Sequence, residues 1–378
     1  MIDLDTLGNP PNWLAADTIE RSRAALEGGL ARETWKYSSL TKTLRMLIGA
    51  PGVSRAPLAD VPEGVSVTRL SALATPPALT LDIERYPLAG ITASLAAEGW
   101  LIDVKGSPDR PLVLDCETGI NAPTILRVHR GCRVDIREPG ARGGVRASVR
   151  VLQADAGSTV CWAQAELADD AEQWWLLKAQ LKDNASLELH QHAAGARFRR
   201  LDTHVTLQGT GSNCLATGAG IVGPGEHLDR QQVVEHAGRN TFSRTKLHNL
   251  AGGRSRCSFN GRIHIHPGAS GADADLSNKN LALDIEAEIN TKPELEIYTD
   301  DVRCAHGATV GQIDPNALFY LQSRGLPEHR ARRILCIGFL TECIRGPLAD
   351  KVLNAFLARL DGAAPSAAAE LPGGSAQS

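Results

Sequence analysis

A short turn recurs at an almost constant interval through the middle of the chain. The segments between its copies are short runs of apolar, often β-branched residues with no helical period, such as Ser148-Val-Arg-Val-Leu152. A repeat of roughly 20–50 residues is typical of a solenoid, and β-type segments indicate a parallel β-helix. A β-sandwich of similar short strands is the alternative that this pattern leaves open. The copies begin 26, 27, 27 and 27 residues apart, at Gly131, Gly157, Asn184, Gly211 and Gly238.

The regions on either side of the repeats have different patterns. Residues 1–75 combine helical stretches with Pro-rich breaks, which predicts an N-terminal helical region. We expect the β-helix core over 76–313. Asp314 followed by Pro315 is a typical helix start, and the periodicity beyond it predicts a C-terminal helical domain over 314–361. Residues 362–378 are dominated by Ala, Ser, Pro and Gly, which predicts a disordered tail.

Within the N-terminal region, an amphipathic helix is predicted from Thr18 to Leu30, with Gly28 and Gly29 at its end. It is followed by a polar stretch that holds Trp35 and Tyr37, in a chain with only 4% aromatic residues. We expect these rings to pack against the neighbouring β-helix, because large aromatic side chains are usually buried.

Composition excludes several classes of protein. Forty basic residues against 43 acidic ones give a net charge of −3, without the basic excess that a nucleic-acid binder needs. No apolar run approaches the roughly 20 residues that span a bilayer, and no secretory or transit pattern is recognisable at Met1-Ile2-Asp3. The eight cysteines include no Cys-x-x-Cys pair. We therefore expect a cytoplasmic protein with reduced thiols.

Motifs for nucleotide binding and hydrolysis are missing from the sequence. It contains no Gly-Lys dipeptide, no Gly-x-Ser-x-Gly and no His-Glu-x-x-His. The glycines of Gly218-Ala-Gly-Ile-Val-Gly223 match a dinucleotide fingerprint, but Pro224 follows where a helix should start. We interpret this stretch as a glycine-rich turn.

Two pairs of residues are candidate metal ligands. His264 and His266 lie in an extended pattern, as do Cys304 and His306. Residues i and i+2 share one face of a strand, so each pair can present two ligand atoms together. Thiolate and imidazole ligands suit iron, zinc or an iron–sulfur cluster. The alternative is that these side chains only pack, as we expect for Cys336 and Cys343 on the second C-terminal helix.

Several segments resemble one family. They are Lys292–Gly311, Ala317–Gly325, Phe259–Leu281 and Glu33–Tyr37. The chain resembles the SufB/SufD family, scaffold subunits of the SUF iron–sulfur cluster assembly system, and its Cys-x-His arrangement is similar to the SufD type. The strong likeness covers about residues 259–325. The resemblance implies a right-handed parallel β-helix flanked by N-terminal and C-terminal helical regions. It also implies that the last strands pair with a SufB-like paralogue and that the C-terminal helices dock a SufC-like ABC ATPase.

By this resemblance, Cys304 and His306 are ligands for iron or a nascent, transient cluster at the partner interface. His264 and His266 are weaker candidates. The chain is then a non-catalytic scaffold that binds no nucleotide itself. The sequence leaves open whether it also forms a homodimer. Two other classes stay open from the residues alone: a stand-alone β-helix enzyme that acts on carbohydrate, and a metal-free structural homodimer.

Overall fold

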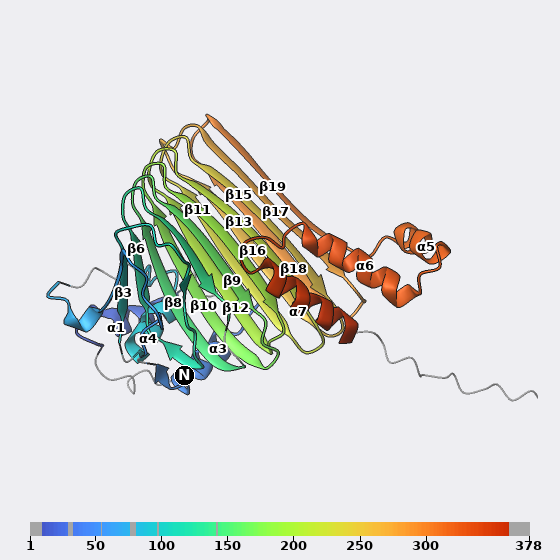
Figure 1. Cartoon of the computed structure of the whole chain (residues 1–378), viewed down its shortest axis with the longest axis horizontal. Helices are drawn as coiled ribbons and strands as arrows, with labels where there is room; N and C mark the ends of the chain where they lie inside the picture. Colours follow the sequence, from blue (N-terminus) through green and yellow to red (C-terminus); the bar gives the residue numbers. More distant parts are fainter. Residues whose placement is uncertain are drawn as a thin grey trace, which may run out of the picture.

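The core of the chain is a parallel β-solenoid. The computed structural model describes residues 10–28, 33–53, 55–75, 81–96, 98–140 and 143–362. Successive strands alternate between two sheets that face each other along the solenoid (Figure 1), so each turn adds one strand to each sheet. The mostly β fold with a parallel solenoid core is therefore confirmed, and the β-sandwich is excluded. The predicted tail lies, apart from Gly362, outside the described residues.

The larger sheet runs in the order β18-β16-β14-β12-β10-β8-β6-β3-β2, with β5 beside β8 and β1 beside β5. Its strands are β1 (Gly52–Val53), β2 (Val65–Arg69), β3 (Trp100–Val104), β5 (Gly119–Asn121), β6 (Thr124–Val128), β8 (Gly144–Ala154), β10 (Ala171–Leu181), β12 (Phe198–Leu207), β14 (His227–His236), β16 (Arg256–Ile265) and β18 (Glu288–Ile297).

The smaller sheet runs in the order β19-β17-β15-β13-β11-β9-β7-β4. Its strands are β4 (Leu112–Val113), β7 (Arg133–Glu138), β9 (Thr159–Glu166), β11 (Ser186–Ala194), β13 (Asn213–Val222), β15 (Phe242–Ala251), β17 (Ala272–Ala282) and β19 (Val302–Gly311).

The repeat is longer near the C-terminal end than the turn spacing predicts. Residues that stack on neighbouring strands are 26 or 27 apart in the early turns, as for Lys182 and Gln208. They are 30 to 32 apart in the last turns, as for Arg256 and Glu288. The fifth turn is accordingly misplaced in the sequence analysis. Asn240, not Gly238, takes the left-handed backbone conformation that Gly211 has one turn earlier.

The glycine-rich stretch 218–223 is mostly strand, not the turn that we predicted. Gly218 and Gly220 lie inside β13. A Cβ atom on Gly218 would come within 2.5 Å of the backbone oxygen of Gln191, and one on Gly220 within 2.5 Å of the side-chain oxygen of Asn249. Close packing between neighbouring strands explains these glycines, so they are not evidence for a nucleotide-binding motif.

The N-terminal elements cover the outer face of the larger sheet. They include α1 (Thr18–Glu27), α3 (Leu40–Ile48), a 3-10 turn (Leu70–Ala72) and α4 (Pro87–Leu95), which form one apolar cluster with residues of β8 and β10. Sequence analysis expected only strands after residue 76 and missed α4. This helix is buried on nearly every residue and so has no amphipathic period.

Trp35 docks on the solenoid, as predicted. It is buried, and the guanidinium of Arg200 lies 3.8 Å from its ring centroid. Arg200 also donates hydrogen bonds to the backbone oxygen of Thr34 and to the carboxylates of Asp202 and Asp229, each at 2.9 Å. A single buried cation therefore joins the N-terminal layer to β12 and β14.

The C-terminal helices lie on the outer face of the smaller sheet, where α6 (Glu328–Thr341) and α7 (Ala349–Gly362) pack on β9, β11, β13 and β15. Cys336 and Cys343 are both buried there, although Cys343 lies just beyond the end of α6 rather than within it. The first helix of this group, α5 (Pro315–Ser323), begins at the predicted N-cap Asp314. It has no buried residue and extends away from the strands (Figure 1). Among the described residues, no helix has the length and apolar character needed to cross a membrane.

Replacing Arg200 with Ala should lower the free energy of unfolding by about 3–5 kcal/mol, because two buried carboxylates lose their cation. Urea denaturation measures this value. The matched control is Arg197→Ala, since Arg197 pairs with Asp170 and both side chains are more than half exposed. That change should lower the free energy of unfolding by less than about 1 kcal/mol. Equal losses in the two variants would contradict a special role for the buried cation.

Candidate functional site

The last turn of the solenoid is open. Strands β18 and β19 end the two sheets, and neither has a described strand on its outer side. They lie at the opposite end of the solenoid from β3 (Figure 1). Each interior strand forms backbone hydrogen bonds on both sides, but these two offer one free row of amide and carbonyl groups each. The end of the core is therefore a surface on which another strand can pair.

Cys304 and His306 share one face of β19. In the parallel register, Cys304 lies opposite Ala274 of β17, and His306 lies opposite Leu276. Both of these β17 residues are buried inside the solenoid, so the pair is on the inward face of its last strand. Cys304 is half-buried against the apolar interior, and His306 is exposed at the open end. The structure brings the two side chains together, and their role as ligands stays a prediction.

The surroundings of Cys304 favour its protonated form. Burial raises the pKa of the Cys304 thiol, and the negative charges of Asp275 and Asp273 raise it further. Asp273 is itself paired with Arg244 at 2.7 Å, which leaves Asp275 as the less compensated charge. In the isolated chain this residue is therefore a thiol at neutral pH. Positive charge placed beside the sulfur would favour the thiolate.

His264 and His266 lie together on the outer face, not beside Cys304. Their rings are stacked, with centroids 4.1 Å apart and an angle of 10° between the planes. The Nε2 atom of His266 lies 3.4 Å from Oε2 of Glu235, which belongs to the neighbouring strand β14. The Nδ1 atom of His264 lies 3.8 Å from Oε2 of Glu296 on β18. The predicted pair thus gains carboxylate neighbours from strands on both sides.

Glu235 was missed by sequence analysis. It stands opposite His264 in the parallel register, although the two residues are far apart along the chain. Interaction with the His204 side chain, together with the charges of His204, His266 and His264, lowers the pKa of Glu235 to about 2. Its carboxylate is consequently ionised at neutral pH.

A second cluster of metal-ligand types, Cys161, Glu188 and His190, was also missed. Their ligand atoms lie within 4.8 Å of one another. Cys161 and Glu188 are paired in register across β9 and β11, one repeat apart. Burial raises the pKa of Cys161 to about 11, and burial lowers the pKa of His190, whose Nδ1 is 2.8 Å from the Thr217 hydroxyl. The 27-residue period could have revealed this cluster, since it places Cys161 beside Glu188.

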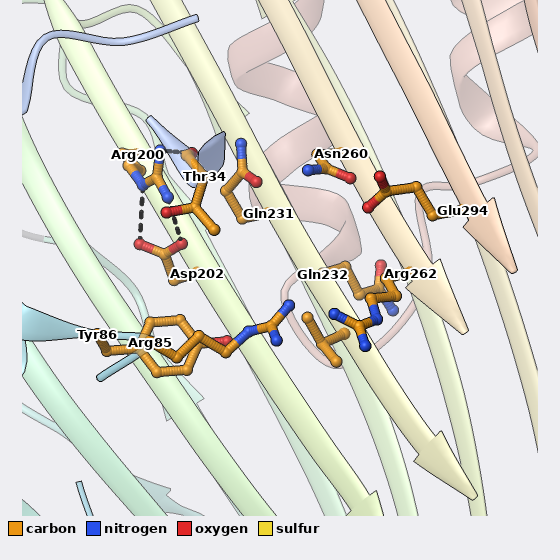
Figure 2. Close-up of a pocket in the computed structure, with 11 residues that line it drawn as sticks. Thr34, Arg85, Tyr86, Arg200, Asp202, Gln231, Gln232, Asn260, Arg262 and Glu294 are labelled. Atoms are coloured by element: carbon orange, nitrogen blue, oxygen red, sulfur yellow. Dashed lines mark hydrogen bonds and ion pairs between the residues drawn. The ribbon is translucent and has the colours of Figure 1, made fainter. Parts of the chain in front are cut away.

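A pocket separates the N-terminal layer from the outer face of β12, β14, β16 and β18. In Figure 2, Arg85 and Tyr86 lie on the left below the Arg200–Asp202 pair, and Arg262 lies on the right. The cations at this pocket are mostly neutralised, since Arg262 pairs with Glu296 and Arg200 with two aspartates. The residues that line the pocket are mostly polar and lie between the N-terminal layer and the larger sheet.

Comparison with known proteins identifies the family. Residues 117–339 match the family described as "SUF system FeS cluster assembly, SufBD core domain", which is more than half of the chain. The chain belongs to the SufB/SufD family. The matched part runs from β5 to α6 and contains Cys304, His306 and the outer histidine pair.

Individual relatives agree with this assignment. The iron–sulfur cluster assembly protein SufD of Escherichia coli is 35% identical over 188 residues, which are 49% of this chain and 44% of that protein. A SufBD family iron–sulfur cluster assembly protein of Mycobacterium leprae is 31% identical over 219 residues, 56% of each chain. The chain thus spans about half the length of the curated relatives it matches. It is a SufBD family protein of iron–sulfur cluster assembly with homology to SufD.

Replacing Asp275 with Asn should speed alkylation of Cys304 by iodoacetamide at pH 8 by roughly two- to threefold, because the pKa of the thiol falls toward its ordinary value. Peptide mass spectrometry measures the rate at each cysteine. The matched control is Asp135→Asn, since the Asp135 charge acts on Cys161 instead. An unchanged rate at Cys304 in Asp275→Asn would contradict the electrostatic explanation. A faster rate at Cys304 in both variants would also contradict it.

Proposed function

We propose that this chain is a SufD-type scaffold subunit, which works with a SufB-like paralogue and a SufC-like ABC ATPase. The observation that carries the proposal is the position of Cys304 and His306 on the last, unpaired strand of the solenoid. A paralogue with a similar open end can continue both sheets by pairing with β18 and β19. Homology to SufD supports this arrangement.

The pair on β19 is an incomplete ligand set. One thiol and one imidazole provide two donors, whereas iron in clusters and in mononuclear sites takes more. In this proposal the paralogue supplies the other donors across the joined strands. The iron or nascent cluster is then cargo that is held transiently, and this chain acts as a scaffold, not as an enzyme. The raised pKa of Cys304 fits this role, because the thiol stays protonated until metal and partner are both present.

The ATPase is proposed to dock on the C-terminal helices. Phe319 and Tyr320 of α5 are 71% and 57% exposed, and Ile334 of α6 is 47% exposed. Large aromatic side chains on a helix with no buried residue are typical anchors of an interface. Since α6 and α7 pack on the smaller sheet, movement of the ATPase can be transmitted to the strands that end at β19.

His306→Ala and Cys304→Ser should each leave the complex assembled and lower its cluster content severalfold, because each removes one ligand from the site. Anaerobic co-purification of the tagged chain from its host, followed by iron and sulfide analysis, measures both quantities. The matched controls are His329→Ala, on the exposed surface of α6, and Cys161→Ser, a half-buried cysteine of a middle turn.

Full cluster content in the β19 variants would contradict the ligand role. Recovery of the wild-type chain without a paralogue or an ATPase, while both are expressed, would contradict the scaffold proposal itself. That result would return attention to a metal-free homodimer or to a stand-alone enzyme.

Phe319→Glu should remove the ATPase from the purified complex and retain the paralogue, because the two partners use different surfaces. Loss of one aromatic anchor lowers affinity by at least about tenfold. The matched control is Val61→Glu, which places the same charge on an exposed apolar position of the N-terminal region. Quantitative mass spectrometry of the complex measures the ratio of subunits. Loss of both partners, or of neither, would contradict separate docking surfaces.

A further inference from the structure

The outer face of the penultimate turn gathers a second donor set that the scaffold role does not use. Glu235, His264 and His266 each offer a ligand atom, and these atoms all lie within 4.8 Å of one another. Glu235 comes from β14, His264 lies near the end of β16, and His266 directly follows that strand. The backbone ladder between these strands fixes the spacing of the three side chains.

Their spacing is close to that of a metal site. In a tetrahedral site with bonds of 2.0–2.1 Å, neighbouring ligand atoms are about 3.3 Å apart. Nε2 of His266 and Oε2 of Glu235 are 3.4 Å apart. The planes of the two stacked histidine rings are nearly parallel, so binding one ion through both rings requires rotation of one ring. The His266 side chain is 35% exposed, which gives this rotation room.

A buried histidine behind the cluster supports the same interpretation. His204 is 4% exposed, and its Nε2 lies 3.2 Å from Oε1 of Glu235. Neither ring nitrogen of His204 forms a hydrogen bond of normal geometry, and the inaccessible Nε2 of His266 also lacks one. Buried polar atoms are rarely left in this state. A metal ion would use the nitrogen of His266, and His204 would orient Glu235 from its other oxygen, as supporting residues do in metal sites.

We propose that Glu235, His264 and His266 bind a divalent first-row transition metal, such as Zn²⁺ or Fe²⁺. Two imidazoles and one carboxylate favour these ions over Mg²⁺ and Ca²⁺, which prefer oxygen donors throughout. Three protein ligands at the surface leave a coordination position open to water or to an exchanging ligand. The site is separate from Cys304 and His306, which belong to the other sheet and face inward.

The test is a titration of the purified, metal-free full chain with Co²⁺, followed by its visible absorption, and then competition with Zn²⁺. The chain carries Cys304→Ser and His306→Ala, so that the inward pair cannot provide its thiol and imidazole ligands to the added metal. We expect one equivalent of Co²⁺ to bind with a spectrum of nitrogen and oxygen ligands and no thiolate charge-transfer band. Adding His264→Ala and His266→Ala together should weaken binding at least about 100-fold, and His204→Gln about tenfold.

Glu235→Gln preserves the shape of the side chain and removes its charge, so it tests the site if the double histidine variant does not fold. Thermal unfolding followed by circular dichroism verifies the fold of each variant. His329→Ala and Glu188→Gln are the controls for surface histidines and for the Cys161 cluster. Undiminished affinity without His264 and His266 would overturn the proposal, as would loss of binding in the Glu188 control. Because the chain is tested alone, this result is independent of any partner.

Discussion

Backbone pairing between successive turns is the constraint on which the rest of this structure depends. In a parallel solenoid each strand satisfies its amide and carbonyl groups with the strands before and after it, so only the two ends are left open. At the N-terminal end, β2 pairs with β3 in antiparallel fashion, and an isolated bridge joins Leu58 to Leu114. At the C-terminal end, no described strand covers β18 or β19. The open edge is longer at the turn that carries Cys304, where β18 and β19 have ten residues each, than at β2 with five and β4 with two.

The same ladder determines which side chains meet. Residues that are one repeat apart lie side by side, so one face of a sheet collects side chains from many distant positions. At the last turn the inward face carries Cys304 and His306, which lie opposite the buried residues Ala274 and Leu276 of β17. On the outward face of the larger sheet, the histidine pair near the open end is only partly buried. Both candidate sites lie in the last turns of the solenoid, toward its open end.

Much of the fold followed from local features of the sequence. The turn period predicted the solenoid, and the spacing of Cys304 and His306 predicted their shared face, because both depend only on strand geometry. Contacts between side chains of different turns were harder to predict, because they depend on the register in which the strands pair. The repeat lengthens from 26 residues to 32, which displaced the fifth turn and concealed Glu235 beside His264. Helix α4 was missed because burial on all sides removes its period, and β13 because its glycines serve close packing.

The two donor sets differ in the chemistry that they favour. Cys304 is a soft ligand whose thiolate form is disfavoured by burial and by nearby aspartates, so it gains most from an interface that brings both metal and positive charge. Glu235 and its imidazole neighbours are oxygen and nitrogen donors, so the outer set suits a hydrated divalent ion. In the proposed scheme, one chain would hold a metal ion on the outward face of one sheet, apart from the softer donor pair on the inward face of the other.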